Sequence, residues 1–154
     1  MQATAPSELT HCGRDIASRR NSITHVKVRA AFLGLVAALV GVLGIHLSFS
    51  AYSRLVLALF LSLTACVYLG ALLAQAQSLG TWAAELAVAA VVFGCSLLGI
   101  SASPVWLAFG YGIHGGWDWL HETRTVQTRV AGWFPPLCAT FDLVVGAFIL
   151  GWVR

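Results

Sequence analysis

Two histidines and an aspartate recur on one face of a predicted helix in the last third of the chain. His114, Asp118 and His121 are spaced by four and three residues, and on an α-helix such positions fall within roughly 60° of one another. A further aspartate, Asp142, interrupts a later apolar segment. Neutral imidazoles and ionised carboxylates are ligands that suit zinc and non-haem iron. The pattern therefore predicts a metal site formed by His114, Asp118, His121 and Asp142.

The same side chains also fit two arrangements without a metal. In the first, the histidines and carboxylates relay protons or bind a cation transiently, as ionisable groups inside membrane proteins often do. In the second, they only link neighbouring helices through hydrogen bonds, which is common between membrane spans. The spacing does not choose among these three arrangements. Unlike the H-E-x-x-H motif, it is not tied to a known arrangement of metal ligands.

Two glutamates are candidates for a catalytic base near His114, Asp118 and His121, which we call the polar stripe. Beyond the N-terminal region the chain has only four acidic residues, and the two aspartates are already assigned as ligands. Glu85 or Glu122 would then accept a proton from a metal-bound water, whose pKa zinc can lower to about 7. Glu122 also fits a simpler description, a solvated carboxylate at a helix end.

The elements that must position these residues are membrane-spanning helices. Of the 154 residues, 58% are hydrophobic and only 10% are charged, whereas soluble domains carry about 25% charged residues. The apolar stretches approach the ~20 residues needed to cross ~30 Å of hydrocarbon. The fourth carries charges in its C-terminal half, so a shorter or re-entrant element also fits it. We predict an all-α integral membrane protein with five transmembrane helices in a single bundle, at about 30–49, 55–75, 81–101, 104–121 and 135–153.

The basic residues predict how this bundle is oriented. Residues 1–29 read as a polar, mobile N-terminal tail and contain five of the nine Lys and Arg residues. With five spans, the loop 122–134 lies on the same side and adds two more. Only Arg54 and Arg154 fall on the other side. The positive-inside rule therefore places the N-terminus in the cytoplasm and the C-terminus on the opposite side of the membrane.

This topology brings the scarce polar residues to a similar depth. At 1.5 Å per residue, Glu85 lies about 6 Å and Asp118 about 5 Å inside the cytoplasmic edge of the apolar layer. His114 and Asp142 lie about 10 Å inside by the same rise. An ionisable group at mid-depth costs at least roughly 2.5–3.5 kcal/mol. We therefore expect these side chains to face one another in the cytoplasmic half of the bundle.

Three functions fit such a cluster. The first is a metal-dependent enzyme that uses zinc or iron and acts on a lipid or another apolar substrate. The second is a small carrier or proton-coupled accessory subunit. Since five spans are too few for the usual pair of inverted repeats, transport would require a homo-oligomer or a larger membrane complex. The third is a structural or assembly protein without catalytic activity. The basic residues gather beside the membrane without interleaved aromatics, so the expected partner is the lipid bilayer and not nucleic acid.

The motifs around the polar stripe resemble those of a family of small, multi-span membrane proteins of unknown function. The stretch Gly110–His121, then W-x-P at 133–135 and C-x-x-x-D at 138–142, is similar to that family's pattern. The pattern reads G-x-x-x-H-x-x-W-D-x-x-H-H, W-x-P and C-x-x-x-D. The resemblance covers roughly residues 30–153 and is most specific toward the C-terminus.

This resemblance bears on the site and implies no activity. It implies that one set of residues belongs together, with Glu85 as a fifth member: His114, Asp118, His121 and Asp142. One position departs from the pattern, because Glu122 stands where the family has the second histidine of a His-His pair. At a metal site, Glu122 would supply an oxygen ligand in place of a nitrogen.

Overall fold

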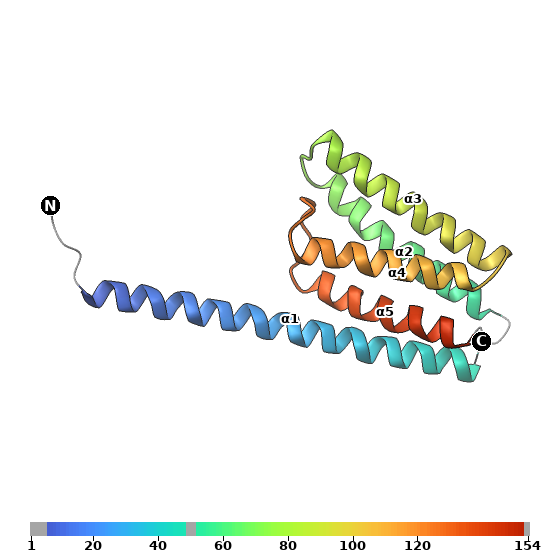
Figure 1. Cartoon of the computed structure of the whole chain (residues 1–154), viewed down its shortest axis with the longest axis horizontal. Coiled ribbons are helices and arrows are strands. Elements are labelled where there is room, and N and C mark those ends of the chain that lie inside the picture. The colour runs from blue at the N-terminus through green and yellow to red at the C-terminus, as the bar shows by residue number, and fades with distance from the viewer. Residues whose placement is uncertain (1–5, 49–51, 153–154) are drawn as a thin grey trace.

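Each apolar stretch forms one α-helix in the computed structural model of the chain (Figure 1). The structure describes the backbone of residues 6–48 and 52–152, and the side chains of residues 22–47 and 52–152. Within these residues it contains five helices and no strand. The helices are α1 (Pro6–Ser48), α2 (Ser53–Leu73), α3 (Leu79–Ser101), α4 (Val105–Glu122) and α5 (Phe134–Trp152).

The helix boundaries lie within two residues of the predicted spans, except at the start of α1. The predicted ends at residues 49 and 153 fall outside the described residues. Within the polar segment 1–29, the described residues are helical from Pro6 onward, and this helix continues into the first apolar stretch. Pro6 occupies the first helical position, where a missing N–H is tolerated, and no later proline interrupts the helix.

The helices form one antiparallel bundle with α4 at its centre. α4 contacts α2, α3 and α5, and α1 packs along α5. Figure 1 shows that the α2–α3 and α4–α5 connections lie at the end from which α1 projects beyond the bundle. We call this the inner end and the opposite one the outer end.

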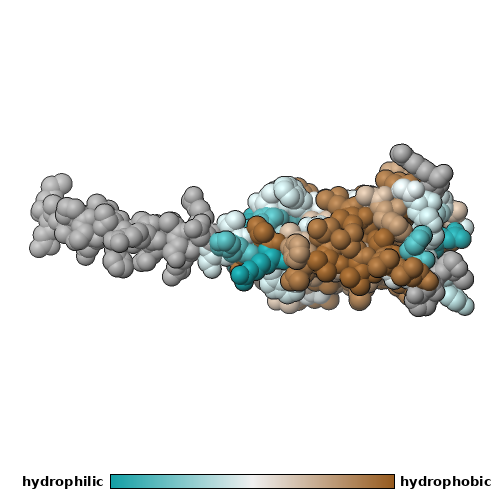
Figure 2. Space-filling view, turned by 90° about the horizontal axis from the view of Figure 1, so that it is seen from below, coloured by the Kyte–Doolittle hydropathy of each residue, from teal (hydrophilic) through white to brown (hydrophobic). Residues whose placement is uncertain are grey.

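The surface of the bundle is that of a membrane protein. Four helices are long and apolar enough to cross a membrane: α2, α3, α5 and, in α1, Ser22–Leu47. Large apolar side chains point outward, for example Leu63 at 65% and Leu97 at 68% exposed. Figure 2 shows a broad hydrophobic band with hydrophilic residues at both ends. A soluble monomer rarely exposes so large an apolar patch, so the chain is an integral membrane protein.

The remaining helix, α4, is not among those four apolar helices. Its 18 residues are apolar toward the outer end and polar toward the inner end. Its polar residues are covered by the neighbouring helices, since His114, Asp118 and His121 are all buried. A helix that turns its polar face into the bundle does not expose that face to lipid.

The outer half of the bundle is packed with apolar side chains. Leu61, Leu107 and Ile149, from three different helices, are fully buried there. Tyr111 joins them, and its hydroxyl donates a hydrogen bond of 2.9 Å to the Leu57 carbonyl oxygen. The phenol of Tyr111 therefore has a hydrogen-bond partner within an otherwise apolar core.

One glycine sets the distance between α1 and α5. A Cβ atom added to Gly34 would lie 2.2 Å from the Leu137 carbonyl oxygen, closer than any real contact. Small residues allow such close helix approach in membranes, where lipid competes with protein for apolar contact. Gly34 therefore lets α1 pack against the backbone of α5 near the inner end.

Candidate metal centre

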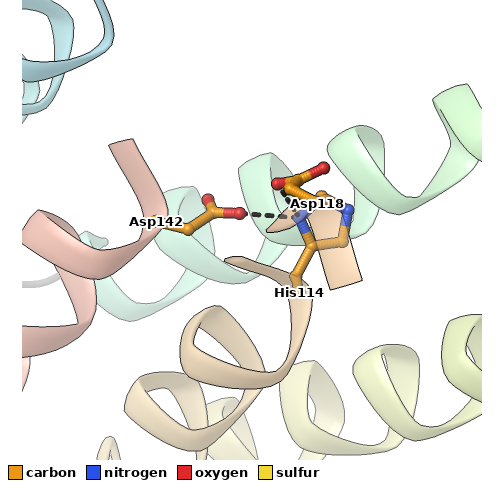
Figure 3. Close-up of side chains that lie close together, drawn as sticks. All are labelled: His114, Asp118 and Asp142. Carbon is orange, nitrogen blue, oxygen red and sulfur yellow. Dashed lines mark hydrogen bonds and ion pairs between the residues drawn. The ribbon is translucent and has the colours of Figure 1, made fainter. Parts of the chain in front are cut away.

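Three buried side chains meet between α4 and α5 (Figure 3). His114 and Asp118 lie one turn apart on α4, and Asp142 faces them from α5. Nδ1 of His114 lies 2.6 Å from Oδ2 of Asp142 and 3.4 Å from Oδ2 of Asp118. Potential ligand atoms of the three residues all lie within 4.8 Å of one another. We call these residues the triad, and its donor set is one that can hold a metal ion.

The approach of α5 to the triad depends on Gly115. A Cβ atom at this position would lie 3.2 Å from the Asp142 Cβ atom and 3.5 Å from the Ala139 carbonyl oxygen. Glycine thus lets the aspartate reach the imidazole across the helix interface. Gly112 and Gly116, on the same helix, have no such neighbour within 4 Å.

α2 contributes a residue that sequence reasoning did not assign to the site. The hydroxyl of Tyr68 donates a hydrogen bond to Oδ1 of Asp118. Its ring lies 4.1 Å from the ring of His121 and 5.9 Å from that of His114, measured between centroids. The available signal is a tyrosine within a span that is otherwise nearly all apolar.

Each residue of the triad has a buried polar atom without a hydrogen-bond partner. These atoms are Nε2 of His114, Oδ2 of Asp118 and Oδ1 of Asp142. An unsatisfied buried polar atom costs about 1–3 kcal/mol, and native proteins contain few of them. The three atoms therefore mark the triad as a place where a ligand would be stabilised.

A second polar group lies beside the triad, between α3 and α4. Nε2 of His121 lies 3.0 Å from Oε1 of Glu85, and the Trp117 indole N–H donates to Oε2 of Glu85 at 2.9 Å. Nδ1 of His121 lies 2.9 Å from the Trp117 carbonyl oxygen. Since both ring nitrogens face oxygen acceptors, neither is free to bind a metal in this arrangement.

The structure therefore divides the predicted four-ligand set. Three of its members form the triad, and His121 pairs with Glu85 instead. The reason is geometric, because the ring of Tyr68 lies against the ring of His121, tilted by 31°, at the border of the triad. Spacing along α4 placed His114, Asp118 and His121 on one face. It did not show that a ring from α2 lies at the border between His121 and the triad.

A small cavity joins the two groups. Its volume is about 10 Å³, and it is lined by Tyr68, Glu85, His114 and Trp117 together with three small apolar side chains. That volume is close to the space of one water-sized sphere. Figure 3 shows the second ring nitrogen of His114 turned away from Asp142. The imidazole thus contacts Asp142 on one side and leaves its other nitrogen for a further partner.

Glu122 lies apart from both groups. Its Oε1 atom is 2.5 Å from Nζ of Lys27 on α1, and 21% of its side chain is exposed. Sequence reasoning assigned Lys27 only to membrane orientation, because nothing along the chain relates it to a residue 95 positions away. The ion pair joins the polar part of α1 to the end of α4.

An open cavity of about 1430 Å³ occupies the inner end of the structure. It lies between α1, the end of α4 and the two inner connections, and His121 forms part of its wall. The Glu85–His121 pair thus separates this inner cavity from the triad. Among its lining residues are Lys27, Gln75, His121, Glu122, Arg124 and Arg129.

Residues 28–153 match the model of DUF6010, which is described as a family of unknown function. The match covers most of the chain, so the protein belongs to that family. This confirms the resemblance to a family of unknown function seen in the motifs. No curated protein and no solved structure matches the chain.

Proposed function

We propose that this DUF6010 protein is a metal-dependent membrane enzyme that acts on a lipid or another apolar substrate. The observation that supports it is the triad, in which each residue keeps a buried polar atom without a hydrogen-bond partner. Two buried carboxylates also repel each other unless their charge is balanced. A divalent cation would balance both and would use the unpartnered atoms as ligands.

The donor set indicates the kind of metal. One imidazole and two carboxylates suit zinc or non-haem iron better than soft, thiolate-preferring ions. Catalytic zinc sites use three protein ligands and leave a position for water or substrate. Bound there, a divalent metal would supply a Lewis acid and lower the pKa of its water.

The surrounding residues divide the remaining roles. Glu85 lines the small cavity with His114, which makes it the better placed of the two predicted bases. A proton taken by Glu85 can pass to His121, with which it shares a hydrogen bond, and from there to the inner cavity. Glu122 is paired with Lys27 outside the triad, so we assign it no catalytic role. Tyr68 orients Asp118.

The place of the triad supports an apolar substrate. Its three residues are buried between helices whose outer surfaces face lipid, so an apolar molecule reaches this depth more readily than a soluble one. The inner cavity offers a route for the polar part of such a substrate. A lipid, with one apolar and one polar part, matches both features.

We further propose that all five helices cross the membrane, with the inner end in the cytoplasm. Basic residues support this orientation, since Lys27, Arg29, Arg124 and Arg129 lie toward the inner end and Arg54 toward the outer end. Reporter proteins fused to the two termini should then lie in opposite compartments. Reporters in the same compartment would contradict the five-span topology.

Metal content tests the proposed function directly. Protein purified in detergent, without chelators or an affinity metal, should contain about one zinc or iron ion per chain by elemental analysis. His114→Ala should reduce the content to background. His46→Ala is the matched control, because His46 lies on α1 near the outer end, far from the triad.

A second variant protects the test against misfolding. Asp118→Asn keeps the size of the side chain but weakens its ligation of metal, and circular dichroism should show unchanged helix content. Metal-free wild-type protein would refute the metal centre. Wild-type metal content in both His114→Ala and Asp118→Asn would refute it too.

A proton-coupled carrier or accessory subunit is the second candidate. It is favoured by the line of polar groups that runs from Asp142 through His114 and Glu85 to His121 at the inner cavity. Proteoliposomes with an internal pH dye should then show proton flux that Glu85→Gln slows. This line of polar groups ends at the apolar outer half. A monomer that shows no detectable proton flux would therefore count against the carrier.

A further inference from the structure

The inner cavity carries an excess of positive charge. Among the described side chains, the basic residues Lys27, Arg124 and Arg129 line it, and the one carboxylate, Glu122, is paired with Lys27. Arg124 and Arg129 are exposed, and neither guanidinium has an acidic partner among the side chains that the structure describes. An anion in the cavity would therefore meet two uncompensated guanidinium groups.

Arg124 has an unusual backbone conformation. Its φ angle is 59°, the only positive φ of a residue other than glycine in the described part of the chain. Its N–H bonds to the His121 carbonyl oxygen at 3.1 Å and closes the end of α4. Glycine is favoured at such a helix end because it adopts this conformation without steric cost. An arginine there is disfavoured by local structure, and such residues concentrate at ligand sites.

Arg129 stands on a connection that is fixed to α2. Its N–H donates to Oε1 of Gln75 at 3.0 Å, and its carbonyl oxygen accepts from Nε2 of Gln75 at 2.7 Å. One glutamine thus holds both backbone groups of the arginine. The position of Arg129 relative to the cavity is therefore set by the helix bundle.

The cavity also has an apolar wall beside its basic residues. Ile23, Val26 and Val130 line it, and the exposed indole of Trp133 stands at its edge. Tryptophan is enriched at membrane interfaces. A small inorganic anion would gain nothing from such a wall, whereas an amphiphile with an anionic head would use both surfaces.

We propose that the inner cavity binds an anionic phospholipid, with its phosphate on Arg124 and Arg129 and its apolar part against the wall formed by Ile23, Val26 and Val130. Guanidinium groups recognise phosphate through paired, charge-assisted hydrogen bonds. This binding site goes beyond the proposed enzyme function, because it requires no metal. It also brings a lipid headgroup next to His121.

The test is lipid binding to the full-length protein in detergent, measured by native mass spectrometry. Phosphatidylglycerol is the anionic probe, and phosphatidylcholine is the zwitterionic comparison. One arginine near an anionic surface contributes about a fivefold change in affinity, so two should contribute about 30-fold. The double variant Arg124→Gln/Arg129→Gln should lose that factor for phosphatidylglycerol. Its loss for phosphatidylcholine should be smaller, because the choline cation balances the charge of the phosphate. Arg54→Gln, with the same charge change at the outer end, should bind both as wild type does.

Arg124→Gly separates binding from folding. Glycine removes the charge and relieves the backbone, so affinity for phosphatidylglycerol should fall about fivefold while the melting temperature stays equal or rises. Unchanged phosphatidylglycerol affinity in the double variant would overturn the proposal. An equal loss in Arg54→Gln would do the same, by showing that only net charge matters. Glycerol phosphate binding as tightly as the lipid would overturn the lipid assignment in favour of a soluble phosphate.

Discussion

The outer and inner halves of the bundle are built on the same two helices but packed by different means. In the outer half, Leu107 and Ile149 of α4 and α5 are buried among other apolar side chains. In the inner half, His114 and Asp142 of the same helices are buried to the same degree. Burial alone therefore does not distinguish the candidate site from the core in this protein.

What distinguishes the two halves is whether buried polar atoms find partners. The phenol of Tyr111 in the outer half donates to the Leu57 carbonyl oxygen. In the inner half, the triad leaves one polar atom without a hydrogen-bond partner on each of its three residues. Proteins keep such unfavourable arrangements where the rest of the fold supplies the stability, and they do so mainly at functional sites. The outer half thus resembles an ordinary core, and the inner half holds the candidate site.

The largest effect should come from breaking the buried pair. Asp142→Ala leaves His114 without its partner from α5, and losing one side of a buried ion pair costs about 3–5 kcal/mol. The measurement is unfolding free energy in mixed detergent and SDS, together with metal content, which should fall to background. A stable, metal-loaded Asp142→Ala protein would mean that the inner half is ordinary core.

The matching change in the outer half is Ile149→Ala. The free energy of unfolding should fall by about 2 kcal/mol, at the low end for such truncations. The loss is small because unfolding in a membrane moves this side chain from an apolar core into apolar lipid, not into water. The same unfolding assay measures it. Metal content should equal that of the wild type, and a loss of metal would show that the halves are coupled more tightly than their separate packing indicates.

Gly115→Ala sharpens the comparison at the helix interface. The new methyl group would press on Asp142, and overpacking of this kind costs about 1.5 kcal/mol, with weaker metal binding. Gly112→Ala is the control on the same helix, since its Cβ has no such contact. The control should be neutral or slightly stabilised. Equal unfolding free energy and equal metal binding in the two variants would show that Gly115 has no steric role.

The smallest change in stability is expected for Tyr68→Phe. Hydrogen bonds between membrane helices average about 0.6 kcal/mol, but partners of metal ligands often change metal affinity by about tenfold or more. Tyr111→Phe removes a comparable hydroxyl from the outer half. Metal titration should therefore show weaker binding only in Tyr68→Phe. Identical affinities in both variants would separate Tyr68 from the site.

Much of the inner half could be predicted from the sequence. His114, Asp118 and Asp142 follow from the cost of placing ionisable groups in a membrane, and the depth argument correctly brought Glu85 near them. Tyr68 and Lys27 could not be found in this way. A tyrosine and a lysine are ordinary residues of membrane helices, and only their contacts with Asp118 and Glu122 show what they do.

The sequence by itself determined the membrane environment, the helices and the order of the polar residues along them, because hydropathy, helical period and residue type are local properties. Only the tertiary structure decided which polar residues meet. It assigned His121 to Glu85 and not to the triad, and it continued α1 through the polar segment. Those outcomes depend on how far apart the helices lie and how each is rotated. Close contacts such as those at Gly34 and Gly115 set both quantities, and no spacing along one helix contains them.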